Sequence, residues 1–159
     1  MLLADAYRVF LYRQDLLAAV LSTQVSRRAG YWGSDRERYQ KLKPGALPLE
    51  EVAEQIRLLR ESLEGYHGFL REQRLDCLVL SYEDVFNRPW PETWERLRAL
   101  FEHVRLPEPR SPAKEVLRLL CGPEMKVNDE DTLSCVSNRH ELLEGLGATR
   151  WLRRDAAPV

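Results

Sequence analysis

The chain has 159 residues, of which 44% are hydrophobic and 31% are charged, a composition typical of one globular domain and not of a disordered protein. Its formal net charge of -1 gives no basic field of the kind that general nucleic-acid binding requires. No apolar run approaches the roughly 20 residues of a membrane helix, and residues 1–6 are too short for a secretory signal, so we expect a cytoplasmic protein without a membrane span.

The three cysteines, Cys77, Cys121 and Cys135, have no spacing typical of a metal site or of a disulfide framework. We therefore expect no bound metal, and we expect the reducing conditions of the cytoplasm. Cys77 falls within an apolar run, where a free cysteine is commonly a buried packing residue.

The first predicted element is a strand over residues 8–12, because Val, Phe, Leu and Tyr follow one another there. Arg13 comes at its carboxyl end, and Asp15 is a favourable residue for starting the next helix. In parallel α/β sheets, ligands bind outside the carboxyl ends of the strands. A guanidinium at that edge matches the oxygens of a phosphate or sulfate group. The alternative is an ion pair within a strand-turn-helix packing unit.

The helix that follows Asp15 has an apolar face and a face of small residues. The apolar face consists of Leu16, Leu17, Val20 and Leu21. Ser22 lies on the small face, so its hydroxyl is a candidate ligand of the anion that Arg13 binds. Small residues of this kind also serve helix packing, and the pattern alone leaves both interpretations open.

Residues 31–49 carry several glycines and prolines and predict a long loop. Its aromatic residues, Tyr31, Trp32 and Tyr39, either contact an acceptor such as a sugar or pin the loop to the rest of the domain. Residues 49–74 predict the clearest helix, because apolar residues recur there at alternating spacings of three and four and form one stripe.

A second strand is predicted over residues 76–82, which is apolar throughout as a buried parallel strand should be. The helix between the two strands makes a right-handed parallel crossover the expected connection. Tyr82, Glu83 and Asp84 then lie at the same sheet edge as Arg13. The two acids suit either acid–base chemistry or helix capping and ion pairing, and the second role is the commoner one.

Three further helices are predicted: one that opens near Pro91, one over residues 113–120, and one that is capped by Ser137 and Asn138 and ends at Gly145. Residues 122–132 predict a polar loop in which Lys126 is the basic residue. We expect residues 155–159 to form a disordered tail, so that a single domain spans residues 1–154.

Three stretches resemble the PAPS-dependent sulfotransferases, especially the bacterial branch of that family. They are, in chain order, YRQDLLAAVLS, SYEDVFNRPWPETWERLRALFEHVRLP and KVNDEDTLSCVSNRHELLEGLGATRWL. The first is similar to the family's 3′-phosphate-binding strand end and helix, the second to its Tyr-Glu-Asp strand end, and the third to its carboxyl-terminal segment. The resemblance rests on their order and spacing and extends over residues 7–152.

The resemblance implies a helix-rich α/β fold, an incomplete three-layer P-loop-NTPase-like arrangement with helices flanking a parallel sheet. It implies PAPS (3′-phosphoadenosine 5′-phosphosulfate) as the donor co-substrate, no metal, and the hydroxyl of a small molecule or carbohydrate as the acceptor. Arg13 and Ser22 would bind the 3′-phosphate. Lys126 lies where a loop of the family supplies basic residues, but the familiar Arg-Lys-Gly element is absent, so a solvated lysine is the alternative.

The phosphosulfate-binding loop of the family is missing, since no Gly-x-x-x-x-Gly-Lys-Ser/Thr pattern occurs. The twelve residues before Arg13 are also too few for a βαβ unit of about thirty residues. We therefore expect the carboxyl-terminal portion of a sulfotransferase-like domain, inactive alone, with a complementing amino-terminal segment or a second copy as partner. The sequence identifies no catalytic base.

Two other hypotheses stay open. The first is a non-catalytic α/β remnant that acts as a binding or assembly module and exposes the sheet edge that a missing strand would cover. The second and weaker one is half of a nucleotide-binding, kinase-like fold, because arginines that bind phosphate recur there.

Overall fold

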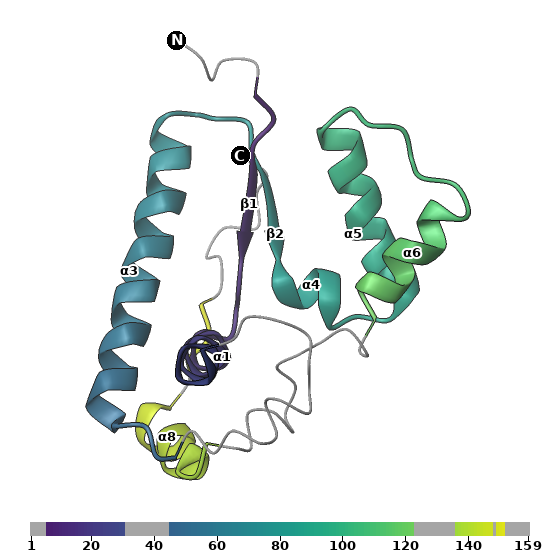
Figure 1. Cartoon of the computed structure of the whole chain (residues 1–159). Helices are drawn as coiled ribbons and strands as arrows, with labels where there is room; N and C mark the ends of the chain where they lie inside the picture. Colours follow the sequence, from purple (N-terminus) through teal and green to yellow (C-terminus); the bar gives the residue numbers. More distant parts are fainter. Residues whose placement is uncertain (1–5, 31–44, 123–135, 148, 152–159) are drawn as a thin grey trace. The chain divides into compact units, whose positions relative to one another are not determined.

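The computed structural model describes residues 6–30, 45–122, 136–147 and 149–151. It is mixed α/β and mostly helical, with one small parallel sheet, so the predicted α/β class is confirmed (Figure 1). The elements are β1 (Val9–Tyr12), α1 (Leu16–Ala29), α3 (Leu49–Glu72), β2 (Leu78–Ser81), α4 (Tyr82–Phe86), α5 (Trp90–His103), α6 (Ala113–Leu120) and α8 (Arg139–Leu146). The predictions for Tyr31, Trp32, Tyr39, Lys126, Cys135 and the tail lie outside the described residues.

The chain forms two compact units. The sheet unit consists of Met1–Gln14, Leu63–Met125 and Arg153–Val159, and the helical unit consists of Asp15–Ser62 and Lys126–Leu152. The helix α3 contributes its first part to the helical unit and its last part to the sheet unit. None of the helices in the described part of the chain combines the length and the apolar character that spanning a membrane requires.

The sheet unit is built on two parallel strands, which pair from Val9 opposite Leu78 to Tyr12 opposite Ser81. Both strands lie within the predicted segments and are slightly shorter. Ser81 is buried, whereas Leu11 of β1 is 56% exposed. The register brings the residues that follow the two strands to the same edge of the sheet.

Three helices follow β2 in the sheet unit. The helix α4 begins after Ser81, whose hydroxyl accepts the Asp84 N–H at 3.1 Å. The helix α5 has Pro91 in its first turn, where a missing N–H costs no intrahelical hydrogen bond. The core of this unit is formed by Val85, Trp94 and Leu97, with Phe86, Trp90, Phe101, Leu117 and Cys121 packed against it. The predicted helix over residues 113–120 is confirmed as α6.

In the helical unit, α1 has a clear signal at each end. Asp15 accepts the N–H of Ala18 at 2.9 Å, and Gly30 adopts a left-handed φ of 59°. The predicted apolar face is confirmed, because Leu16, Leu17, Val20 and Leu21 are all buried. The Leu16 N–H donates to the Thr149 carbonyl at 3.1 Å, which holds the described end of the chain against the start of α1.

The long helix α3 agrees with its predicted bounds to within two residues. Its apolar stripe is only partly buried, since Val52 and Ile56 are covered but Tyr66 is 65% exposed. The stripe is covered over only part of its length because a helix of 24 residues is about 36 Å long. That length exceeds what one small unit covers, and α3 belongs to two.

The helix α8 begins where predicted, but not for the predicted reason. Asn138 occupies the position before the helix without making a side-chain cap bond. Its amide nitrogen instead donates to the Leu47 carbonyl at 2.8 Å, and its amide oxygen accepts the Leu47 N–H at 2.9 Å. Asn138 therefore satisfies a buried backbone segment far away in sequence, a role that local pattern does not reveal.

Candidate functional site

The carboxyl ends of β1 and β2 meet at one edge of the sheet, as their parallel register requires. Arg13 follows Tyr12 on the first strand, and Tyr82 follows Ser81 on the second. The predicted placement of Arg13 and Tyr82 at one edge is therefore confirmed. We call this edge the strand-end site and define it by Arg13, Gln14, Ser81, Tyr82, Glu83 and Asp84.

The Arg13 guanidinium lies over the Tyr82 ring, with its central carbon 4.5 Å from the ring centroid. Tyr82 in turn stacks on Phe86, with a centroid distance of 4.6 Å and an interplanar angle of 29°. A guanidinium over an aromatic ring is attracted by the negative face of the ring, which favours this position of the charged group. Among the described carboxylates of the sheet unit, none forms an ion pair with Arg13, so the ion-pair alternative is not supported there.

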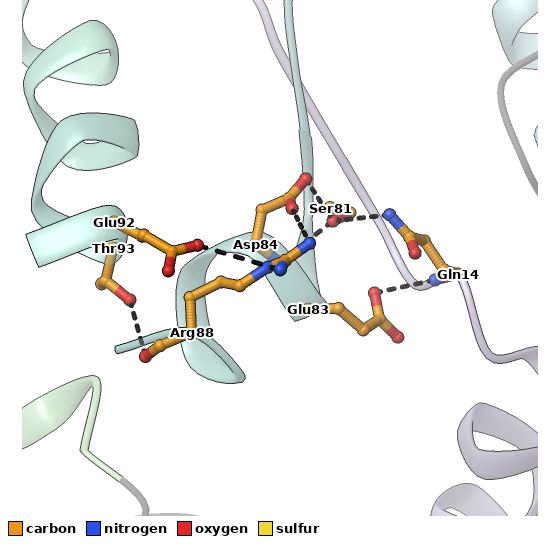
Figure 2. A network of polar contacts seen from close by, with 7 residues as sticks. All are labelled: Gln14, Ser81, Glu83, Asp84, Arg88, Glu92 and Thr93. Carbon is orange, nitrogen blue, oxygen red and sulfur yellow. Dashed lines mark hydrogen bonds and ion pairs between the residues drawn. The ribbon is translucent and has the colours of Figure 1, made fainter. Parts of the chain in front are cut away.

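A hydrogen-bond network beside Arg13 joins the two strand ends (Figure 2). The Gln14 backbone N–H donates to the Glu83 carboxylate at 2.9 Å, and the Gln14 side-chain amide donates to the Ser81 hydroxyl at 3.1 Å. The Ser81 hydroxyl donates to the Asp84 carboxylate at 2.7 Å. Because Ser81 is 1% exposed and its hydroxyl is fully used, the network fixes the backbone that carries Arg13.

Both acids of the Tyr-Glu-Asp element take part in this network. The Glu83 carboxylate accepts the Gln14 backbone N–H (Figure 2). The Asp84 carboxylate accepts the Ser81 hydroxyl and lies 3.7 Å from the guanidinium of Arg88. These contacts favour the structural interpretation of the two acids over acid–base chemistry. Their negative charge nonetheless lies at the edge where Arg13 would bind an anion, and it opposes that binding.

The other two predicted site residues do not add to this geometry. Ser22 is a half-buried residue of α1 in the helical unit, whereas Arg13 belongs to the sheet unit. Their joint contact with one anion stays a prediction. Lys126 lies outside the described residues, so its contact with phosphate also stays a prediction.

Sequence reasoning missed the roles of Gln14 and of the Tyr82 ring. Gln14 joins the strands through both its backbone and its side chain, and Tyr82 supports the Arg13 guanidinium. The sequence signal that could have revealed these roles is the position of both residues at or just after the end of a predicted strand. Once two parallel strands are aligned at their carboxyl ends, the residues just after each strand become neighbours.

No group of three or more His, Cys, Asp or Glu side chains in the described ranges is arranged to hold a metal ion. A scan against protein-family models and searches of curated proteins and of solved structures found no match to this chain. Any function must therefore be argued from the residues and their geometry.

Proposed function

We propose that this chain is the 3′-phosphate-binding portion of a PAPS-dependent, sulfotransferase-like domain with an incomplete three-layer, P-loop-NTPase-like fold. The observation that carries the proposal is the Arg13 guanidinium held over the Tyr82 ring at the carboxyl end of a parallel strand. In the proposed site, Arg13 binds the 3′-phosphate of PAPS, with Ser22 and Lys126 as further ligands. The resemblance of three sequence stretches to that family supplies the identity of the nucleotide.

The geometry at Arg13 supports an anion ligand in particular. Tyr82 restricts the orientation of the guanidinium before any ligand arrives, which lowers the conformational entropy that binding would otherwise cost. The N–H donors of a guanidinium form a planar fork that matches two phosphate oxygens at once. A charge-assisted contact of this kind contributes about 1.5–3 kcal/mol. That range corresponds to roughly ten- to hundredfold in the dissociation constant.

In the proposed reaction, an acceptor hydroxyl oxygen forms a bond to the sulfur of PAPS while the bond from sulfur to the 5′-phosphate oxygen breaks. Adenosine 3′,5′-bisphosphate leaves, and the hydroxyl proton passes to a base outside the strand-end site. Arg13 contributes by positioning the nucleotide and does not touch the transferred group. The reaction also needs a phosphosulfate-binding loop beyond the strand-end site, so the test of the proposal is binding of the nucleotide.

Thermal unfolding with nucleotides tests the proposal. Adenosine 3′,5′-bisphosphate should raise the melting temperature of the wild-type chain, because a ligand that binds only the folded state stabilises it. Adenosine 5′-monophosphate, which lacks the 3′-phosphate, should raise it less. Arg13→Ala should lose the difference between the two nucleotides. The matched control is Arg96→Ala, at an exposed position of α5. Equal shifts for wild type and Arg13→Ala would defeat the site assignment.

One observation favours the second candidate, a non-catalytic assembly module. The outward residues Val9 and Leu11 of β1 are 41% and 56% exposed, although parallel strands are normally covered on both faces. If this surface serves assembly, the chain should form a dimer that Leu11→Glu dissociates. Light scattering coupled to size-exclusion chromatography measures this, and a monomer that binds the bisphosphate would favour the first candidate instead.

A further inference from the structure

A cavity of about 430 Å³ opens in the sheet unit, and its lining shares no residue with the strand-end site. Its lining includes Arg88, Trp90, Thr93, Glu115, Arg118 and Cys121. These residues come from the start of α5, from α6 and from the segments that flank the two helices. Small-molecule pockets commonly have volumes of about 300–1,000 Å³, so the cavity is large enough for a one- or two-ring compound.

The cavity has an aromatic and apolar side that is held by the core of the unit. Trp90 and Cys121 line it and also pack against the buried cluster of Val85, Trp94 and Leu97. The rings of Trp90 and Trp94 lie 5.6 Å apart at an angle of 38°. An indole held in this way offers a flat surface of fixed position to another ring.

The polar side of the cavity is formed by two arginines, Arg88 and Arg118, whose N–H donors are not all used by neighbouring carboxylates. Arg88 approaches Asp84 and Glu92 no closer than 3.7 and 3.8 Å (Figure 2). Arg118 approaches Glu115 no closer than 3.7 Å. These separations exceed hydrogen-bond length. By contrast, Arg98 binds a carboxylate at 2.8 Å. A guanidinium has five N–H donors, so both arginines of the cavity keep donors for a ligand.

The backbone position of Arg88 is itself fixed. The Thr93 hydroxyl, which is almost fully buried, donates to the Arg88 carbonyl at 3.2 Å (Figure 2). The charged lining consists of two guanidinium groups and the carboxylate of Glu115, and the carboxylates of Asp84 and Glu92 lie near Arg88 outside the lining. The cavity therefore combines an aromatic surface with guanidinium donors that are not saturated by their neighbouring carboxylates.

We propose that this cavity is a binding site for a small aromatic monoanion, with its ring on Trp90 and its sulfonate or carboxylate group at Arg88 and Arg118. The site does not depend on the proposed nucleotide function, because it shares no residue with the strand-end site. Charge-assisted contacts to the two guanidinium groups and stacking on the indole would supply the affinity.

Naphthalene-2-sulfonate is the probe, and titration calorimetry measures its affinity. Arg118→Gln should weaken binding about tenfold, the loss expected for one charge-assisted contact. Arg118 is preferred to Arg88 for this test because Arg88 also contacts Asp84 of the strand-end site. The control Arg96→Gln, on the exposed surface of α5, should bind as the wild type does. The neutral naphthalene-2-sulfonamide should bind the wild type about tenfold more weakly than the sulfonate.

The position of the probe is measured separately through Cys121, a half-buried thiol of the cavity wall. Saturating naphthalene-2-sulfonate should slow the alkylation of Cys121 by iodoacetamide, followed by peptide mass spectrometry. A dissociation constant weaker than about 1 mM would overturn the proposal. So would equal affinities for the wild type, Arg118→Gln and Arg96→Gln, or an unchanged alkylation rate at Cys121.

Discussion

The hydroxyl of Ser81 holds the strand-end site together, and removing it should cost a measurable part of the stability of the sheet unit. It caps α4 by accepting the Asp84 N–H, donates to the Asp84 carboxylate and accepts from the Gln14 amide. Loss of a cap costs about 1 kcal/mol. The Gln14 amide and the Asp84 carboxylate each lose a hydrogen bond, and each loss costs about 1–3 kcal/mol more where water cannot replace the bond.

The partial exposure of the Asp84 side chain, at 25%, lets water replace part of its lost bond and reduces this sum. We therefore expect Ser81→Ala to lower the free energy of unfolding by about 2–3 kcal/mol. Urea unfolding followed by tryptophan fluorescence measures it, because Trp90 and Trp94 lie in the same unit. The control Ser62→Ala, at an exposed position of α3, should change stability by less than about 0.5 kcal/mol. A Ser81→Ala loss as small as that of the control would refute the reasoning.

Three further outcomes follow from particular contacts. Glu83→Gln keeps an oxygen that accepts the Gln14 N–H but removes a negative charge from the strand-end site. It should therefore tighten the binding of adenosine 3′,5′-bisphosphate, which calorimetry measures. Weaker binding by this variant would contradict the assignment of the anion site. Asn138→Ala leaves the backbone N–H and carbonyl of the buried Leu47 without their partner. Urea unfolding should show that the free energy of unfolding falls by about 2 kcal/mol. A decrease of less than about half that amount would argue against the contact. Burial raises the pKa of the Cys121 thiol, so less thiolate exists at a given pH. Its alkylation rate should therefore rise with pH along a curve displaced to higher pH than that of a cysteine peptide, and a curve at or below the peptide's would contradict the burial.

Local signals in the sequence were enough to predict most elements of the fold. The apolar strand segments, the Asp15 cap and the three-and-four spacing of α3 each identify an element without reference to the rest of the chain. The shared sheet edge of Arg13 and Tyr82 was also predictable, because parallel strands align their carboxyl ends. These features depend on neighbours in sequence or on a general rule of sheet geometry.

Features that depend on contacts distant in sequence were not predictable in this way. The pairing of Asn138 with Leu47 joins residues far apart in the chain, and a capping role was the expected local alternative. The contact of Arg13 with the Tyr82 ring and the two bonds of Gln14 depend on the strand register, which the sequence does not state. The same holds for the cavity at Trp90, since it forms between two helices whose packing no local pattern specifies.

The central claim is that Arg13 binds the 3′-phosphate of the nucleotide, and phosphorus NMR tests it at the level of the individual phosphate. Adenosine 3′,5′-bisphosphate has two resolved phosphorus resonances, one for each phosphate group. Titration with the wild-type chain should shift the 3′-phosphate resonance more than the 5′ resonance, and Arg13→Ala should remove that difference. Equal shifts of the two resonances with the wild type, or the same preference for the 3′-phosphate with Arg13→Ala, would contradict the claim.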